Sequence, residues 1–461
     1  MGFIHAVHDL SKGMVFQKKS HPFIQKIWDD NTRMLQIYIE VNDLQLPMEP
    51  AGISAIQLTT GDIQLNVEKS KERYQFKRKP GSGQWQYGPL IQMGMVTAGK
   101  LEQTLKNNIL PKLAKRIFSH MEKDGLFVPG GASKIENLVF SKLSTIESKI
   151  DTNYKTTLVF GISHNGTQYL PGDLACFDDY FYSLISESFT ALQSPVPCSL
   201  CGQSTNTIIN LNKVFNFSTF DKPGFIPGVD DKQLSKVFPV CETCFSELSH
   251  GRTQVEEKFN NTYTLPNTQI WIIPEVISND LSSSGGLKKQ SVIKNFEDYL
   301  EKDASLREKR ILSALTRQNN ALNFHFLFME KDKSKEALLG IIEDVSPSHL
   351  KKLEEIWGEN IRRFTLQGSP KLDTCFSFIT YTLMKDGKSK TNKLEAAYRK
   401  QVAVAILSKL LRGQPVNTHS VKREFVSRYP QIMHLDEYPQ IIRNQFRVVE
   451  FLENYNREVA K

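Results

Sequence analysis

Two Cys-x-x-Cys pairs constrain this sequence more than any other feature. Cys198 and Cys201 form the first pair, and Cys241 and Cys244 form the second. A gap of two residues lets both sulfurs of one turn point at the same ion. Four thiolates then complete a tetrahedral site that leaves no position open for water, as in structural zinc sites. We therefore predict that these four cysteines bind one structural zinc ion.

The segment between the two pairs is long for a zinc-binding module. It spans 39 residues, 202–240, more than the loop of a compact zinc ribbon. We therefore expect the metal to hold the base of an insertion at about residues 195–250.

Three other interpretations of the cysteines remain open but fit the sequence less well. Disulfides would be unusual because only six cysteines occur in 461 residues and no secretory leader is expected; Cys176 and Cys375 look like buried thiols. A zinc deaminase needs an upstream His-x-Glu, whereas the nearest upstream histidine begins His164-Asn165-Gly166. A thioredoxin-like redox site needs one pair at the start of a helix, and here there are two matched pairs.

The excess of positive charge is concentrated near the C-terminus. The whole chain has a formal net charge of +8, with 58 Lys and Arg against 50 Asp and Glu. Between Lys371 and Pro430 there are twelve basic residues and four acidic ones. Such a block favours a polyanionic partner, and nucleic acid is the usual one.

Two groups of cations are candidates for binding nucleic acid. The first lies close to Tyr74 and Phe76 in the sequence and consists of Lys69, Arg73, Lys77, Arg78 and Lys79. Basic side chains can neutralise phosphates while interleaved aromatic rings stack on unpaired bases. The alternative is a solvated strand edge that lysines protect from aggregation.

The second group belongs to the C-terminal region. Its members are Lys385, Lys388, Lys390, Lys393, Arg399, Lys400, Lys422 and Arg423. They are expected on the outer face of a helical bundle, where they would follow opened DNA strands. A solvated basic face without a ligand is the alternative.

Hydrophobic periodicity predicts an α+β fold. Leu35, Ile37, Ile39 and Val41 alternate along one face of a strand, and residues 53–67 continue a mixed or antiparallel sheet. Further strands are predicted at 156–163, 269–274 and 322–328. Residues 101–123 form an amphipathic helix in which every fourth residue is apolar, namely Leu105, Ile109, Leu113, Ile117 and Met121.

The C-terminal part is predicted to be entirely helical. Ser346 followed by Pro347 is a helix start, and no convincing strand follows it. Residues 391–412 form another helix, which Gly413 and Pro415 end. Its packed face is predicted to consist of Leu394, Ala397, Tyr398, Val402, Ala405, Ile406 and Leu410. We therefore divide the chain into a mixed sheet-and-helix domain, 1–345, that carries the zinc insertion, and a basic helical bundle, 346–461.

The sequence contains no recognisable catalytic motif. It has no P-loop, no Gly-x-Ser-x-Gly elbow and no His-Glu-x-x-His, and the pair His8-Asp9 alone is weak evidence for a metal-dependent phosphohydrolase. No stretch has the roughly 18 apolar residues of a membrane span, so a cytoplasmic protein without a membrane partner is expected.

The order of these parts resembles one family, the large subunit of the type I-B CRISPR Cascade, an RNA-guided DNA surveillance complex. The resemblance is carried by the two cysteine pairs, the apolar strand ending at Phe328, the helix start Glu343-Asp344-Val345-Ser346-Pro347-Ser348, and the basic helical tail. It covers the chain from about Pro197 onward.

The resemblance implies a non-catalytic scaffold for antiviral defence. It implies that the protein binds the 5′ handle of the guide RNA, recognises the motif flanking the target in double-stranded DNA (PAM recognition) and stabilises the R-loop. The implied partners are the CRISPR guide RNA, the target DNA, the backbone, handle-binding and small subunits of Cascade, and a nuclease-helicase recruited after target binding. Two alternatives stay open: a nucleic-acid-processing metalloenzyme whose site is scattered in the sequence, and a zinc-bearing RNA-binding structural module.

Overall fold

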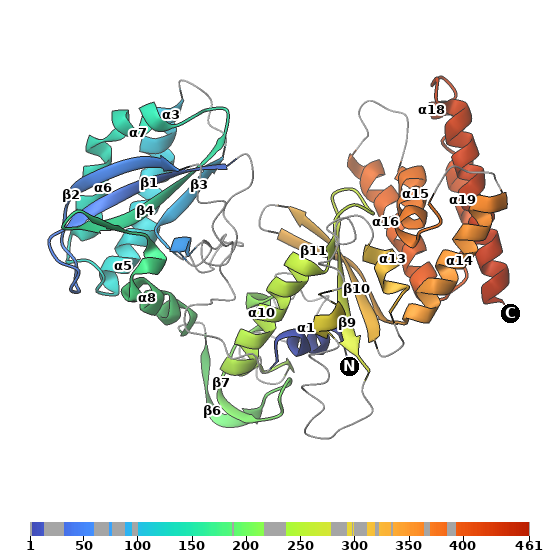
Figure 1. Cartoon of the computed structure of the whole chain (residues 1–461), viewed down its shortest axis with the longest axis horizontal. Coiled ribbons are helices and arrows are strands. Elements are labelled where there is room, and N and C mark those ends of the chain that lie inside the picture. Colours follow the sequence, from blue (N-terminus) through green and yellow to red (C-terminus); the bar gives the residue numbers. More distant parts are fainter. Residues whose placement is uncertain are drawn as a thin grey trace. The chain divides into compact units, whose positions relative to one another are not determined.

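The structure of the chain is a computed structural model, and it divides into two compact units (Figure 1). It describes residues 2–12, 32–59, 73–75, 88–94, 100–186, 189–215, 237–277, 293–296, 298, 311–318, 322–332, 335–363, 369–384 and 393–460. The first unit contains residues 14–213 and 233–242, and the second contains 1–13, 214–232 and 243–461. The predicted division after residue 345 lies inside the second unit.

A mixed sheet forms the centre of the first unit. Its strands are β1 (Thr32–Val41), β2 (Pro50–Thr59), β3 (Leu90–Gly94), β4 (Lys155–His164) and β5 (Thr167–Tyr169). The order is β2-β1-β4-β3 with β5 paired to β4, and only β1 and β4 run parallel. The alternating face predicted for β1 is confirmed, because Leu35, Ile37, Ile39 and Val41 all join the same buried core.

Helices cover that apolar face of the sheet. Residues 101–123 are helical as predicted, but α3 (Leu101–Thr104), α4 (Leu110–Leu113) and α5 (Ser119–Lys123) are separated by π turns at Leu105–Ile109 and Ala114–Phe118. In an α-helix, a spacing of four residues drifts by about 40° per step. The wider π turns offset this drift, and all five predicted apolar residues are buried.

Further α-helices described in the first unit are α6 (Gly131–Ser141), α7 (Leu143–Lys149) and α8 (Ala175–Ser186). The glycine-rich turn before α6 does not hold free amide groups for a phosphate. The N–H groups of Gly130 and Ala132 donate to the carboxylate of Glu122, at 2.9 and 2.8 Å. This segment is therefore a turn that Glu122 closes.

An antiparallel sheet forms the centre of the second unit. Its order is β11-β10-β9-β8, with β8 (Asn260–Asn261), β9 (Gln269–Val276), β10 (Leu322–Asp332) and β11 (Lys335–Val345). Aromatic side chains dominate the core against it. Phe296 packs on both Phe259 and Phe324, each with a ring separation of 5.7 Å.

The other elements described in the second unit are helices. Its helices are α1 (Phe3–Ser11), α10 (Glu242–Lys258), α13 (Ile311–Leu315), α14 (Pro347–Arg363), α15 (Leu372–Met384), α16 (Lys393–Leu411), α17 (Thr418–Val426), α18 (Tyr429–Ile432) and α19 (Tyr438–Val459). The predicted start of α14 is confirmed, since Ser346 Oγ accepts the His349 N–H at 3.3 Å. After β11, the described residues contain helices and no strand, so the α+β fold with a helical C-terminal region is confirmed. No helix in the described ranges is long and apolar enough to cross a membrane.

The packed face predicted for α16 is wrong in part. Ile406 and Leu410 are buried as predicted, but Leu394 and Tyr398 are 79% and 54% exposed, and Ala397 and Ala405 also face outward. The buried positions are instead Arg399, Ala403, Val404, Ile406, Leu407, Leu410 and Leu411. Apolar residues occur all round this helix, so periodicity could not choose between faces. Packing against α15 and β11 made the choice.

Helices α1 and α10 approach each other so closely that one position admits only glycine. A Cβ atom added at Gly251 would overlap the carbonyl oxygen of Val7 on α1. The Val7 oxygen is a backbone atom, and the added Cβ would be bonded directly to the backbone of residue 251. Neither atom could therefore move without moving its helix. The contact therefore fixes α1 against α10.

We predict that Gly251→Ala lowers the free energy of unfolding by about 1–3 kcal/mol or more, since overpacking costs this much and a backbone oxygen cannot rotate away. Gly358→Ala is the matched control, because Gly358 also lies inside a helix of this unit and its added Cβ would meet the Pro370 Cβ at an ordinary 3.5 Å. The control should be neutral or up to about 1 kcal/mol more stable through helix propensity. Denaturant titration measures both changes, and equal effects of the two substitutions would contradict the close contact.

Candidate metal centre and nucleic-acid interface

The first cysteine pair lies in a tight turn between two strands. β6 (Thr190–Pro197) and β7 (Ser204–Ile208) pair in antiparallel fashion, and Cys198 follows β6 directly. The Gly202 N–H donates to the Cys198 carbonyl, and the Cys198 N–H donates to that of Gln203, both at 2.9 Å. Gly202 has φ +74°, a conformation that glycine adopts without steric cost. The turn therefore directs both thiols to the same side.

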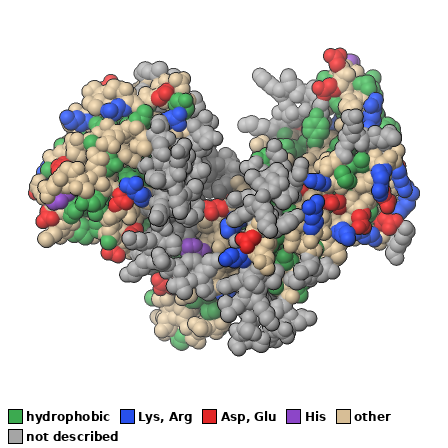
Figure 2. Space-filling view, in the orientation of Figure 1, with side chains coloured by type: hydrophobic (Ala, Val, Ile, Leu, Met, Phe, Trp, Pro, Cys, Tyr) green, Lys and Arg blue, Asp and Glu red, His purple; other side chains and the backbone are tan. Residues whose placement is uncertain are grey.

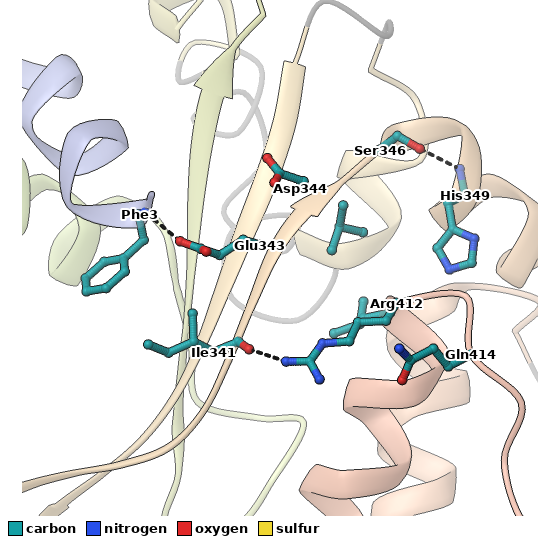
Figure 3. A pocket seen from close by; sticks show the side chains of 10 residues that line it. Phe3, Ile341, Glu343, Asp344, Ser346, His349, Arg412 and Gln414 are labelled. Carbon is teal, nitrogen blue, oxygen red and sulfur yellow. Dashed lines mark hydrogen bonds between the residues drawn. The ribbon is translucent and has the colours of Figure 1, made fainter. Parts of the chain in front are cut away.

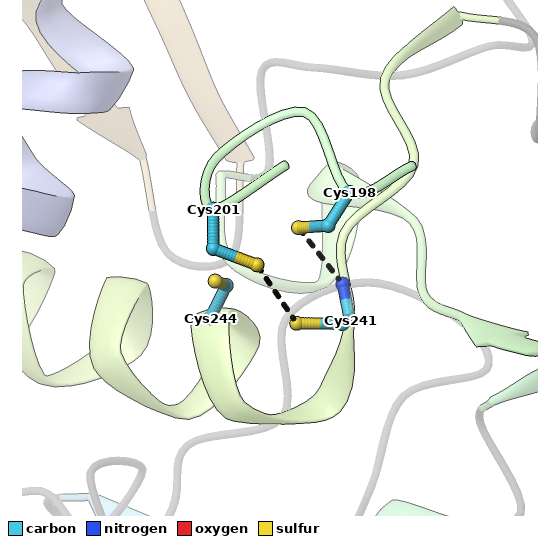
Figure 4. Close-up of side chains that lie close together, drawn as sticks. All are labelled: Cys198, Cys201, Cys241 and Cys244. Atoms are coloured by element: carbon cyan, nitrogen blue, oxygen red, sulfur yellow. Dashed lines mark hydrogen bonds between the residues drawn. The ribbon is translucent and has the colours of Figure 1, made fainter. Parts of the chain in front are cut away.

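The second pair lies at the start of a helix. Cys241 precedes α10, and Cys244 is in its first turn (Figure 4). The Cys241 N–H donates to Cys198 Sγ at 3.4 Å, and the sulfurs of Cys201 and Cys241 are 3.9 Å apart. The structure thus brings together all four predicted ligands, with their sulfur atoms within 4.8 Å of one another.

This geometry fits a zinc ion. Sulfurs at about 2.3 Å from a tetrahedral zinc are about 3.8 Å apart, close to the separation of Cys201 and Cys241. A disulfide would require about 2.05 Å, and the six cysteines are free thiols. Four thiol ligands fill a tetrahedron, so the arrangement suits a structural ion and offers no position for a catalytic water.

The backbone around Cys198 favours its thiolate. Burial alone would raise the pKa of this thiol, but N–H groups of Cys201, Cys241 and Leu200 point at the sulfur and lower its pKa to about 7. Thiolates are the metal-binding form of cysteine, so the backbone N–H groups around Cys198 favour the form that binds a cation.

Helix α10 is held in place by buried polar side chains whose pairing no sequence pattern indicates. His8 on α1 is buried, and its Nε2 lies 2.8 Å from Glu247 Oε2. Their polar atoms lie within 4.8 Å of the Cys244 sulfur, so α1 packs beside one cysteine of the cluster. In the sequence His8 stands out only as part of His8-Asp9, and no sequence signal links it to Glu247.

Arg252 connects the same helix to the sheet. Its guanidinium pairs with Glu256 on α10 and with Glu336 on β11, and it donates to the Val214 carbonyl. Burial would lower the pKa of Arg252, but the two carboxylates raise it further, so the side chain stays charged. Removing one partner of such a buried pair typically costs about 3–5 kcal/mol.

The first predicted nucleic-acid segment lies mostly outside the described residues. Lys69, Lys77, Arg78 and Lys79 are not among them. Arg73 is described, and its guanidinium forms a two-pronged pair with Asp173, at 3.0 and 3.1 Å. Tyr74 is buried and its hydroxyl accepts from Gln36. The side chains of Arg73 and Tyr74 therefore form contacts within the fold.

The C-terminal cations separate into buried and exposed groups. Lys385, Lys388 and Lys390, together with the side chain of Lys393, lie outside the described residues. The side chain of Arg399 is 6% exposed and lies 3.7 Å from Glu395, and that of Lys400 is 12% exposed and pairs with Glu330 on β10. Both side chains therefore contribute to the packing of α16 against neighbouring parts of the fold.

Lys422 and Arg423 on α17 are exposed, as predicted. Lys422 reaches Glu453 at 2.5 Å, but half of its side chain remains accessible. Lys and Arg side chains gather with acidic ones over the C-terminal helices in Figure 2. Lys422 and Arg423 are therefore accessible to a ligand. Their binding of nucleic acid remains a prediction.

The structure adds a group on α19 that the sequence analysis missed. Arg443 is exposed, Phe446 is 66% exposed and Arg447 is half-buried. Besides burial, the charge of Arg443 lowers the pKa of Arg447, so the two cations lie near each other. The spacing of three and four residues places all three on one face of the helix, and this spacing could have been noticed in the sequence.

A family of known proteins matches part of the chain. Residues 196–345, about a third of the chain, match the family model described as the CRISPR-associated protein TM1802 central domain. No curated protein matches the sequence. The match contains the four cysteines and strands β9 to β11, and it supports the resemblance to the large subunit of a CRISPR Cascade.

We predict that the protein purified without chelator carries about one equivalent of zinc, and that Cys241→Ser reduces this content because three thiolates no longer close the tetrahedron. Elemental analysis of both proteins is the measurement. Cys176→Ser is the control, since Cys176 lies outside the cluster. Less than half an equivalent in the unmodified protein, or full zinc content in Cys241→Ser, would exclude the site.

Proposed function

We propose that this chain, whose residues 196–345 match a CRISPR-associated central domain, is the non-catalytic large subunit of a type I-B RNA-guided DNA surveillance complex. The observation that carries the proposal is the match itself, because it covers the segment that holds the cysteine cluster and most of the sheet in the second unit. Participation in a CRISPR-associated assembly follows most directly from it. The finer roles below are part of the proposal.

The cysteine site supports a scaffold role. A closed tetrahedral zinc stabilises the fold and does not activate water. Here it would hold the turn after β6 against the first turn of α10, the helix that Arg252 joins to the sheet. In this proposal the metal maintains the shape of a subunit that positions other molecules.

The exposed cations of the C-terminal helices provide the electrostatic part of the function. Lys422, Arg423 and Arg443 are accessible, and Phe446 offers a ring on which an unpaired base can stack. Contacts of this kind bind phosphates and bases without reading sequence. They suit strands opened by a guide RNA, because base pairing then supplies the specificity.

The remaining roles come from the resemblance. They are binding of the guide RNA 5′ handle, recognition of the flanking motif, contacts with the backbone, handle-binding and small subunits, and recruitment of a nuclease-helicase. Co-purification tests them together. The tagged chain should bring down guide-length RNA and repeated backbone subunits.

Binding measurements on the co-purified complex distinguish the proposed function from the two alternatives. Binding of duplex DNA that depends on a flanking motif and on a matching guide supports the surveillance role. Binding of RNA alone, without guide-dependent DNA binding, would indicate an RNA-binding structural module. Metal-dependent turnover of nucleic acid by the isolated chain would indicate an enzyme and overturn the scaffold proposal.

We predict that the triple variant Lys422→Ala, Arg423→Ala and Arg443→Ala weakens binding of single-stranded DNA or of the opened duplex on all targets alike. The slope of log affinity against log salt should fall by about 0.7–0.9 for each phosphate that the protein no longer neutralises. Preference for the flanking motif should not change, because these cations bind phosphates. Affinity measured over a range of salt concentrations provides both quantities.

The control variant removes the same charge from exposed positions on α6, α7 and the residue between them: Lys134→Ala, Lys142→Ala and Lys149→Ala. Affinity and salt slope should then stay close to those of the unmodified chain. If both variants behave alike, only the net charge of the protein matters. The C-terminal surface would then not hold the strands.

A further inference from the structure

Strand β11 contains a bulge opposite a buried histidine. Phe324 pairs with Val345 and Phe326 pairs with Ile342, so Glu343 and Asp344 together oppose the single residue between them on β10, His325. Asp344 has φ +61°, in the left-handed region that aspartate adopts more readily than most residues. Bulges re-aim side chains and often occur next to functional sites.

The bulge brings three potential ligands together from three neighbouring strands. His325 on β10 is 0% exposed, and its Nε2 lies 2.9 Å from Glu275 Oε2 on β9. A ligand atom of Asp344 on β11 lies with theirs in a group whose members are all within 4.8 Å of one another. The sequence pattern identified His325 only as a residue of the sheet.

The histidine also leaves an unsatisfied polar atom. Its Nδ1 is buried and has no hydrogen-bond partner in the described part of the chain. A buried nitrogen without a partner costs about 1–3 kcal/mol, so the described residues do not satisfy the whole ring. Nε2 carries the contact to Glu275, and Nδ1 is the nitrogen left without a described partner.

We propose that Glu275, His325 and Asp344 bind a divalent cation, separate from the cysteine site. Ligand atoms at about 2.1 Å from an ion and at right angles are about 3.0 Å apart, close to the separation already present between His325 and Glu275. One imidazole and two carboxylates suit Mn²⁺ or a similar first-row ion, whereas four thiolates select zinc. The two sites therefore differ in the metal they prefer.

An open pocket borders one member of this group, Asp344. It has a volume of about 740 Å³, and Asp344 and Glu343 line one side, while His349, Arg412 and Gln414 lie across from them (Figure 3). Three protein ligands leave positions on the cation for water or for an oxygen ligand. A metal site needs an entry path, and Asp344 is the member of the group that lines this pocket.

The neighbouring carboxylate of the bulge provides a matched control. Glu343 accepts the Phe3 N–H through Oε1 at 2.8 Å and does not belong to the three-residue group. Glu343→Gln and Asp344→Asn remove the same charge from adjacent positions of one strand. Asparagine also tolerates the left-handed conformation, so Asp344→Asn should preserve the bulge.

The test uses the full chain with zinc in its cysteine site and no nucleic acid, titrated with MnCl₂ and followed by electron paramagnetic resonance of the free ion. One saturable site is expected, with a nitrogen coupling from the imidazole in pulsed spectra. Asp344→Asn and Glu275→Gln should each weaken binding by at least about tenfold, because even changes behind a ligand cost about 10–100-fold. Glu343→Gln should leave the affinity nearly unchanged.

Three outcomes would overturn the proposal. They are no saturable site at millimolar Mn²⁺, a bound ion without nitrogen coupling, or an equal loss of affinity in Glu343→Gln and Asp344→Asn, which would indicate general attraction by negative charge. Circular dichroism confirms that each variant is folded. The measurement involves no RNA or DNA, so its result is independent of the proposed function.

Discussion

The buried charge of Arg252 is the interaction on which the second unit depends most. It joins α10 to β11 through Glu336, holds Glu256 one turn further along α10, and satisfies the Val214 carbonyl. Its guanidinium also lies 5.3 Å from the centre of the Trp271 ring on β9. The Arg252 side chain therefore fixes α10, which carries Cys244 in its first turn, against the sheet that contains the bulge at Asp344. Burial of this charge is tolerated only because two carboxylates pair with it.

The cysteine cluster and the cluster in the bulge follow the same structural logic. In each, a short-range backbone feature presents donors from one stretch of chain: the turn closed by Gly202 for the thiols, and the bulge at Asp344 for the carboxylate. A second element then supplies the remaining donors. The chemistry differs because soft thiolates select zinc, while imidazole and carboxylates accept harder ions.

The cations of the C-terminal helices show why a charge count does not define a surface. Twelve basic residues between Lys371 and Pro430 predicted a polyanionic partner, yet Arg399 and Lys400 are packed beside carboxylates with little exposure. The accessible cations instead extend to Arg443 on α19, beyond that block, with the half-buried Arg447 beside it. Whether a cation is available depends on the rotation of its helix and on the acidic side chains nearby.

The sequence by itself determined what local rules control: the grouping of the four cysteines, the strand face of Leu35 to Val41, and the start of α14 at Ser346 and Pro347. Short spacing and strong alternation leave few alternatives in these segments. Tertiary structure alone decided the face on which α16 packs, the pairing of His8 with Glu247, and the assembly of Glu275, His325 and Asp344. The packed face of α16 could not be predicted because apolar residues occur all round this helix. The others join residues from separate elements, whose proximity depends on strand register and helix packing rather than on any local pattern.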